Sequence, residues 1–484
     1  MNNNDFTVLN HTLVDYNGAG GDITIPDDVI EIADNAFKGC TVITGLTIPE
    51  GVKTVGESAF EGCTALEHVT VADSVNQYGI SVFQGCKSLK SVVLGSGANL
   101  NYDMFKGCSS LEDLTIPNGV DTIVAPVFGN CTSLKHITLP EDMDEIEEGV
   151  FDDCTALERI DVRNGEEDDF FCSKDGVLFS NYGEILMCYP PNGKTEYVIP
   201  EDVTEINKDA FENCTKLKRL TIPESVEEFG QYAFLNCSSL EGIKIPENVS
   251  ELPRWVFKNC ASLTDIEISE NVEFIDEAVF MGCKSLKRID VAEGNPCFCS
   301  IDGVLFSADK KTLIYLPAGG RTEYTIPEGV KEIGPYACAD CRNITLTFPK
   351  SLKAIGEHED SWCYKDCKLL DCFSGCKFSK GHLKTKVKIN ANLAEVLIDN
   401  GFQPDVLDAV WVYLVQSMKK LRAFTEPKLE ENPAESAEMF IKVLISNKFT
   451  AKQYDAVDEF FTKFKDLIPK ETANEFREMI KSVK

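Results

Sequence analysis

The sequence predicts a mainly β solenoid of stacked repeats, followed by a small all-α domain. The first observation is a repeating distance of 22 or 23 residues between phenylalanines. These are Phe37, Phe60, Phe83, Phe105, Phe128, Phe151, Phe211, Phe234, Phe257 and Phe280, with one longer step of 60 residues between Phe151 and Phe211. The second is the shared frame I-P-x-x-V-x-x-I-x-x-x-A-F-x-x-C-x-x-L-x-x-L-x. The third is the end of this period near Cys376, after which apolar residues follow a helical spacing.

The repeats are too short to bury a core of their own, so we expect them to stack as rungs that share one continuous core. Each position of the frame then packs on the same position of its neighbours. The predicted structural ladder includes Phe60, Cys63, Leu66, Phe234, Cys237 and Leu240. In this ladder cysteine serves as a compact apolar residue with a weak S–H donor. A ladder of disulfides is the alternative in an oxidising compartment, because rungs about 4.8 Å apart bring Cα atoms within disulfide range.

The pattern A-F-x-x-C-x-x-L-x-x-L-x-I-P-x-x-V-x-x-I resembles the BspA-type, or Treponema-type, leucine-rich repeat, and it covers roughly residues 20–375. The resemblance implies a leucine-rich-repeat solenoid with a parallel sheet on its concave face. It also implies a protein-binding role, since members are often bacterial surface proteins that bind host or matrix proteins.

Two interruptions of the period predict β-hairpin insertions at about 163–200 and 292–327. Their sequences "GVLFSNYGEILM" and "GVLFSADKKTLI" read as alternating strands around turn-rich centres. A related, shorter segment predicts an N-terminal β-hairpin cap at 1–30, ahead of repeats at 31–376. A cap of this kind covers the first rung, which otherwise exposes core.

The end of the chain changes in composition. Residues 377–389 form a predicted basic linker, with five lysines and no acid between 377 and 388. Residues 390–484 predict an α-helical domain, whose segments begin at proline or polar residues. The 15 basic and 16 acidic residues of 385–484 nearly cancel, so the acid excess lies in the repeats.

The formal net charge of −32 over 484 residues argues against nucleic acid as a partner. No apolar run long enough for a membrane span is found in the sequence. The N-terminus "MNNNDFTVLNHTLVDYNG" lacks the pattern of a secretory signal, which favours a cytoplasmic protein. The alternative is a cell-surface or secreted adhesin whose leader has been removed. We favour a monomer.

Catalysis finds little support in the sequence, and neither a cofactor nor a metal is expected. His68 and His136 fall on the outward side of predicted strands, but three rungs, about 14 Å, apart. Common nucleophile, zinc-protease, phosphate-loop and dinucleotide motifs are absent from the sequence. One cysteine-rich segment has spacings compatible with zinc: His358, Cys363, Cys367, Cys372 and Cys376, with Cys338 and Cys341 upstream. Because several of these cysteines occupy the repeat frame, a metal-binding or redox protein is kept only as an alternative.

The outward side chains of the strands are the candidate binding surface. They form columns in which charges alternate in sign, as in Glu67 and Lys90. The predicted binding residues are His68, His136, Arg159, Arg219, Arg288, Lys90, Lys135, Glu112 and Asp265. The leading hypothesis is a non-enzymatic scaffold that binds a protein through the concave face, the partner being unidentified. A solvated face whose charges satisfy one another remains the alternative.

Overall fold

The computed structural model describes residues 5–163 and 170–341, together with 344–347, 349, 351–352, 354–355, 470, 473–474 and 477–478. The chain divides into two compact units. Unit 1 is Met1–Leu286 with Ala292–Asn295, and unit 2 is Lys287–Val291 with Pro296–Lys484. Each unit is described by itself.

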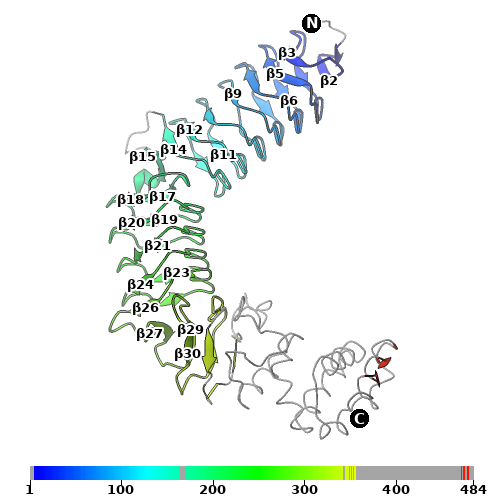
Figure 1. Cartoon of the computed structure of the whole chain (residues 1–484). Coiled ribbons are helices and arrows are strands. Elements are labelled where there is room, and N and C mark those ends of the chain that lie inside the picture. The colour runs from blue at the N-terminus through cyan, green and yellow to red at the C-terminus, as the bar shows by residue number, and fades with distance from the viewer. Residues whose placement is uncertain are drawn as a thin grey trace. The chain divides into compact units, whose positions relative to one another are not determined.

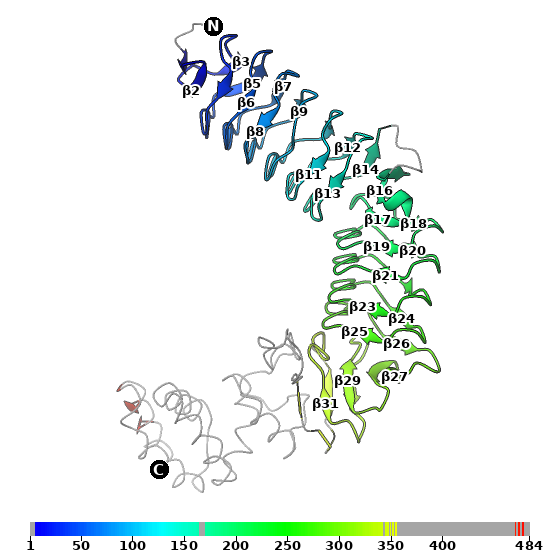
Figure 2. The same cartoon turned by 180° about the vertical axis from the view of Figure 1, so that it is seen from behind.

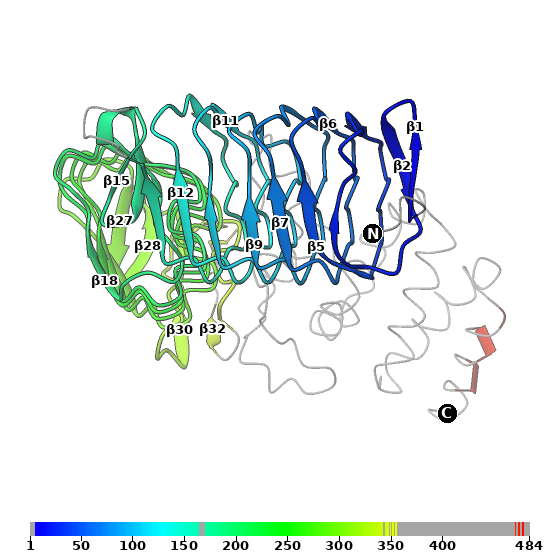
Figure 3. The same cartoon turned by 90° about the horizontal axis from the view of Figure 1, so that it is seen from above.

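Unit 1 is a stack of rungs with two rows of parallel strands (Figures 1 and 2). The long-strand row comprises β3 (Gly21–Thr24), β5 (Ile43–Ile48), β7 (His68–Val71), β9 (Ser91–Val93), β10 (Asp113–Thr115), β12 (His136–Leu139), β14 (Arg159–Val162), β18 (Glu196–Val198), β20 (Arg219–Thr221), β22 (Ile243–Lys244) and β24 (Asp265–Ile268). Figure 3 shows β5, β7, β9 and β12 side by side. Their register is one rung per strand, as in His68 opposite Ser91.

The short-strand row lies at a second position of each rung. It comprises β4 (Glu31–Ile32), β6 (Thr54–Val55), β8 (Gln77–Tyr78), β11 (Thr122–Ile123), β13 (Glu145–Ile146), β19 (Glu205–Ile206), β21 (Glu228–Phe229), β23 (Glu251–Leu252) and β25 (Phe274–Ile275). Both rows alternate in burial. In β7, for example, Val69 and Val71 are buried while His68 and Thr70 are exposed, which is the pattern of a strand with one face on the core.

Antiparallel strands stand where the period is interrupted. In unit 1 they are β1 (Phe6–Leu9) and β2 (Thr12–Tyr16), then β15 (Cys172–Lys174), β16 (Val177–Ser180) and β17 (Ile185–Cys188), with a 3-10 turn at Asn181–Gly183. β2 pairs in parallel with β4, and β17 pairs in parallel with β19, so each insertion ends by joining the short-strand row. The insertion at 163–200 therefore holds three strands rather than the two of a simple hairpin.

Unit 2 repeats this arrangement. Its strands are β26 (Arg288–Val291), β27 (Phe298–Ile301), β28 (Val304–Ser307), β29 (Thr312–Tyr315), β30 (Glu323–Thr325), β31 (Glu332–Ile333), β32 (Thr345–Thr347) and β33 (Ala354–Ile355). β27, β28 and β29 are antiparallel, and β29 pairs in parallel with β31. The predicted linker at 377–389 and the cysteines from Cys363 to Cys376 lie outside the described residues. So does the predicted helical domain at 390–484, apart from Lys470, Ala473, Asn474, Arg477 and Glu478, which are helical.

A column of stacked aromatic rings fills the centre of unit 1. Consecutive rings from Phe37 to Phe151 have centroids 4.8 to 6.1 Å apart. The column restarts after the insertion with Tyr189, whose ring lies 5.0 Å from that of Phe211. Tyr189 thus takes the ladder position that the sequence frame does not mark.

A column of thiols runs beside the rings. Cys63 Sγ donates to the carbonyl oxygen of Phe37, one rung earlier, at 3.1 Å. The equivalent bonds at 3.1 to 3.3 Å are Cys86 to Phe60, Cys108 to Phe83, Cys131 to Phe105, Cys154 to Phe128, Cys237 to Phe211, Cys260 to Phe234 and Cys283 to Phe257. Each of these cysteines is buried, and every cysteine of the described residues is a free thiol. The ladder cysteine is therefore a hydrogen-bond donor as well as a packing residue.

We predict that Cys63→Ala lowers the free energy of unfolding by about 1–3 kcal/mol, because it deletes the bond to Phe37 and leaves a small cavity. Cys40→Ala is the matched control, since Cys40 is only half-buried, and it should cost less than about 0.5 kcal/mol. Urea denaturation of both variants measures the difference. Equal losses in the two variants would contradict a specific role for the buried thiol.

Candidate functional site

The outward side chains of the long-strand row, here called the strand face, contain most of the predicted binding residues. On this face His68 stands opposite Ser91, and His136 stands between Asp113 and Arg159. The outward position two residues further along is mostly threonine, as in Thr70. Threonine side chains and a regular register of one rung per strand characterise this part of the face.

The predicted alternating charges pair with each other. Lys90 Nζ lies 2.6 Å from a carboxylate oxygen of Glu67, and Lys135 Nζ lies 2.7 Å from Glu112. The hydrogen bond to Lys90 lowers the pKa of Glu67, and the bond to Glu112 raises the pKa of Lys135. All four groups are exposed to water, where such pairs contribute little to stability. They are mutually satisfied surface charges.

The two histidines also have neighbours of their own. His68 Nδ1 lies 2.9 Å from Ser91 Oγ, and His136 Nδ1 lies 2.6 Å from Asp113 Oδ1. They do not converge, and no group of three or more metal-ligand side chains occurs among the described residues. Cys338 and Cys341 are buried free thiols, so the part of the cysteine segment that the structure describes is packed in the repeat core.

The predicted binding arginines are already engaged by carboxylates. Arg159 Nε donates to Asp161 Oδ2 at 2.7 Å, and Arg219 Nε donates to Glu196 Oε1 at 3.0 Å. In unit 2 Arg288 makes the same i, i+2 contact with Asp290, at 2.6 Å. Residues two apart on a strand share a face, so the motif Arg-Ile-Asp places the carboxylate beside the guanidinium. The last predicted residue, Asp265, accepts a hydrogen bond from Thr264 Oγ1 at 2.7 Å.

The insertion places a hairpin turn on the strand face beside β14. Its Asp175-Gly176 turn has positive φ at both residues, as the tight hairpin turns of right-twisted strands require. Gly176 packs on Arg159, because a Cβ at Gly176 would lie 2.6 Å from the Cβ of Arg159. Ile160 N–H donates to the Gly176 carbonyl at 2.9 Å. The hairpin turn therefore covers the edge of the sheet that ends in β14.

A cavity of about 250 Å³ opens where the insertion returns to the rungs. Its lining residues are Glu158, Asp175, Val177, Tyr189, Pro190, Asn192, Gly193, Lys194 and Tyr197. Asn192 Nδ2 donates to Glu158 at 3.0 Å, and the Tyr189 hydroxyl donates to the Lys194 carbonyl at 3.0 Å. The insertion thus brings aromatic rings next to a strand face whose predicted columns contain none.

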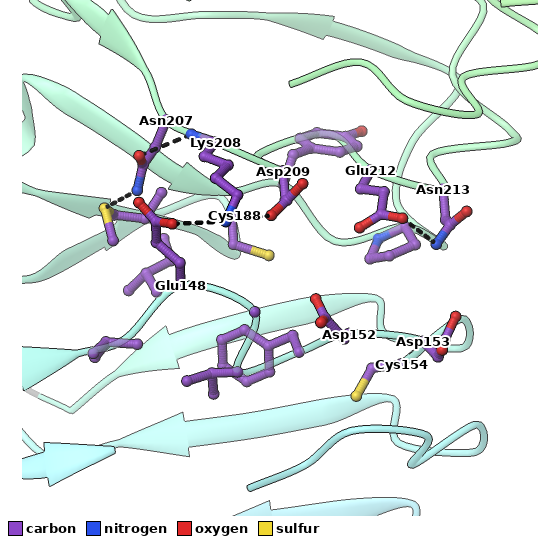
Figure 4. A pocket seen from close by; sticks show the side chains of 18 of the residues that line it. Glu148, Asp152, Asp153, Cys154, Cys188, Asn207, Lys208, Asp209, Glu212 and Asn213 are labelled. Carbon is purple, nitrogen blue, oxygen red and sulfur yellow. Dashed lines mark hydrogen bonds and ion pairs between the residues drawn. The ribbon is translucent and has the colours of Figure 1, made fainter. Parts of the chain in front are cut away.

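A second, smaller cavity of about 60 Å³ lies at the same interruption (Figure 4). Acidic side chains from both sides of the insertion line it: Glu148, Asp152 and Asp153 precede it, and Asp209 and Glu212 follow it. Lys208 pairs with Glu148 at 2.9 Å and also lies 3.7 Å from Asp209. The sequence analysis missed this cluster, because the residues that meet are about 60 positions apart.

Three carboxyls of this acidic cluster, those of Asp152, Asp209 and Glu212, are hard to ionise. Burial raises the pKa of Asp209 to about 6, although the Lys208 charge opposes the shift. Burial, followed by the charge of Asp209, raises the pKa of Glu212 to about 7. Burial and then the Asp153 charge also raise the pKa of Asp152. At neutral pH these carboxyls therefore carry negative charge in a partly buried place where the neutral form is favoured.

Comparison with known proteins identifies the repeats. The family model described as "BspA type Leucine rich repeat region (6 copies)" matches residues 16–102, 98–168, 189–307 and 320–392, more than half of the chain. The chain belongs to the BspA-type leucine-rich repeat family. This confirms the resemblance seen in the sequence and the mainly β solenoid architecture.

Solved structures of leucine-rich repeat proteins are similar over much of the chain. A leucine-rich cell surface protein from Faecalibacterium prausnitzii A2-165 is 25% identical, covering 74% of this chain and 94% of that one, with a TM-score of 0.48. A leucine-rich repeat protein from Eubacterium ventriosum is 21% identical, covering 79% and 93%, with a TM-score of 0.45. The pneumococcal vaccine antigen PcpA is 23% identical, covering 70% and 79%, with a TM-score of 0.44.

Because these TM-scores are below 0.5, the assignment rests on the family match and the observed strands. No curated protein matches the chain. Within the described residues, no helix has the length and hydropathy to cross a membrane. The expected cytoplasmic location stays a prediction.

We predict that Asp209→Asn with Glu212→Gln raises the melting temperature at pH 7.5 but not at pH 4. The folded-state pKa values of about 6 and 7 exceed the usual 3.8 and 4.5, so the native acidic cluster holds extra protons between about pH 4 and 7. Stability contributed by these carboxyls is therefore lost as pH rises through that window, and the neutral amides avoid the loss. Thermal melts across this pH range measure the effect.

Glu227→Gln with Glu228→Gln is the control, because it removes the same number of charges from exposed positions one rung away. A gain for the Asp209/Glu212 variant that is equal at both pH values, or that the Glu227/Glu228 variant reproduces, would contradict the assignment.

Proposed function

We propose that the chain is a non-enzymatic protein-binding scaffold, and that its partner docks on the strand face of unit 1 beside the 163–200 insertion. The observation that carries this proposal is the cavity of about 250 Å³ next to Glu158 and Tyr197. Elsewhere on the strand face, the charges of Lys90 and Lys135 are already paired with Glu67 and Glu112. A concave site with convergent polar groups buries more of a partner than an even sheet does.

The chemistry of the cavity suits a peptide side chain. Tyr189 and Tyr197 supply aromatic surface, with ring centroids 4.8 Å apart. Exposed Lys194 and Asp175 pair loosely at 3.4 Å and stand at the cavity, where a partner's polar groups can exchange for them. Arg159 and Arg219 flank this region on β14 and β20, and the acidic surroundings favour a partner with basic groups at its rim.

The ladder thiols and the strand-face carboxylates support binding rather than catalysis. The thiolate is the reactive form of cysteine, and burial raises the pKa of Cys131 to about 12. The ladder thiols are also engaged by backbone carbonyls. The strand-face carboxylates, such as Glu67 and Glu112, accept from neighbouring lysines, so they serve as surface pairs rather than as bases poised at a cleft.

We predict that Arg159→Glu with Arg219→Glu weakens binding of a protein partner by more than about tenfold, which corresponds to about 1.4 kcal/mol. The partner is obtained by affinity capture with the full chain and then measured with purified components. The melting temperature should change little, because exposed ion pairs contribute about 0–1 kcal/mol.

Lys90→Glu with Lys244→Glu is the matched control. It reverses the same number of charges and breaks two exposed lysine–carboxylate pairs, Lys90 with Glu67 and Lys244 with Glu224, whose residues do not line the cavity. Equal loss of affinity in both double variants would show a general charge effect. Full affinity in the arginine variant would refute docking beside the insertion.

A further inference from the structure

One turn position in unit 1 has backbone geometry that favours small residues. It lies two residues before the ladder phenylalanine of each rung. Positive φ values occur there at Asn35 (60°), Ser58 (53°), Ser81 (58°), Asp103 (57°), Asp209 (58°), Tyr232 (61°) and Trp255 (63°). Asn, Asp and Ser suit this left-handed conformation because their short side chains bond locally.

Tyr232 and Trp255 are exceptions to that pattern. Bulky residues in the left-handed region are rare and cost free energy, typically about 1 kcal/mol or more each. Two adjacent rungs nevertheless carry the two largest aromatic side chains at this position. Their placement is costly for the fold, so it calls for another reason.

The two rings meet, and two cations lie over one of them, the ring of Trp255. The Tyr232 and Trp255 centroids are 5.0 Å apart. The guanidinium carbon of Arg254 lies 4.2 Å from the Trp255 ring centroid, and Lys258 Nζ lies 4.7 Å from it. Both rings are half-buried, so one part of each remains open to water.

The two cations differ in their other contacts. Arg254 Nη2 lies 4.0 Å from Oε2 of Glu277, a carboxylate that is almost fully buried, and the buried Nε of Arg254 has no hydrogen-bond partner among the described residues. Lys258 has no ion pair within the part of the chain that the structure describes. The positive charge of Lys258, positioned over Trp255, is therefore available to pair with an anionic group of a binding partner.

We propose that Tyr232, Arg254, Trp255 and Lys258 form a second protein-binding surface, the turn patch, which takes a peptide segment carrying a carboxylate next to apolar side chains. Tyr, Trp and Arg are the residue types most enriched among binding hot spots. The carboxylate pairs with Lys258, and the apolar groups pack on the open parts of the two rings. None of these four residues belongs to the strand face, so the turn patch stands whether or not the strand face binds.

The charge of the chain decides between classes of anionic ligand. A polyanion such as single-stranded nucleic acid is repelled by an excess of acid that lies mainly in the repeats. Acidic residues flank the patch, because the Asp209 N–H donates to the carbonyl of Gln231, next to Tyr232, and Glu277 lies 4.0 Å from Arg254. A segment with one or two carboxylates among neutral or basic residues avoids that repulsion and still pairs with Lys258.

The test uses a random peptide display library selected on the full chain, followed by fluorescence anisotropy with the enriched peptides. The enriched sequences are expected to contain acidic residues beside aromatic or aliphatic ones. Tyr232→Ser with Trp255→Ser should weaken their binding at least about tenfold. Lys258→Met, which introduces the residue found at the equivalent position Met281, should remove the preference for acidic peptides.

Stability distinguishes binding from a purely structural role. Serine occupies this turn position at Ser58 and Ser81 with similar φ, so the double serine variant should melt at the same temperature or higher. If the double serine variant instead has a lower melting temperature and binds the enriched peptides with unchanged affinity, the turn patch has only a structural role. The proposal would also be overturned if the enriched peptides lack acidic residues. It would equally be overturned if no peptide binds the unaltered chain more tightly than the double serine variant. So would binding of acidic oligosaccharides in place of peptides. Arg159→Glu with Arg219→Glu should leave this binding intact.

Discussion

The backbone carbonyls of eight ladder phenylalanines each accept two hydrogen bonds, and the regularity of the rungs depends on them. Phe60 O accepts the Cys63 N–H of its own rung and the Cys86 S–H of the next rung. A buried acceptor is thereby satisfied twice by one residue type. Valine or alanine cannot donate, and the thiol column lies in the buried core beside the rings, where a donor must also be compact. This requirement explains why so many cysteines share one frame.

The same constraint locates the irregular features of unit 1. Where 60 residues separate Phe151 from Phe211, Tyr189 restores the ring column, and its carbonyl oxygen lies 3.6 Å from Cys214 Sγ. The stacking of the buried core thus continues across the insertion, whereas the regular surface of the rungs is interrupted there. The cavity beside Glu158 and the acidic cluster around Asp209 both lie at this place. The regular rungs provide the packed core that stabilises unit 1. The interruption provides the cavity and the acidic cluster.

The period of the sequence predicts the core because each ladder position packs on its own copies. It also predicts surface pairs such as Glu67 with Lys90, since the register between rungs is fixed. It does not predict Tyr189, which the frame leaves unmarked, or the meeting of Asp152 with Asp209 across an insertion. The partner of Arg159 was present in its own strand, at Asp161, and the alternation of strand side chains could have revealed it. The sequence shows that Trp255 occupies a turn position where other rungs have small polar residues. The free-energy cost of a tryptophan there becomes clear only from its positive backbone φ.

The most direct test of the thiol ladder is the S–H stretching band in the Raman spectrum of the native, fully reduced chain. The account predicts that most of this band is shifted to lower frequency than the band of the unfolded chain, because buried thiols donate to carbonyls. Cys63→Ala and Cys237→Ala should each reduce the shifted part of the band. A native band at the frequency of free thiols, or loss of the band through disulfide formation without reductant, would contradict it.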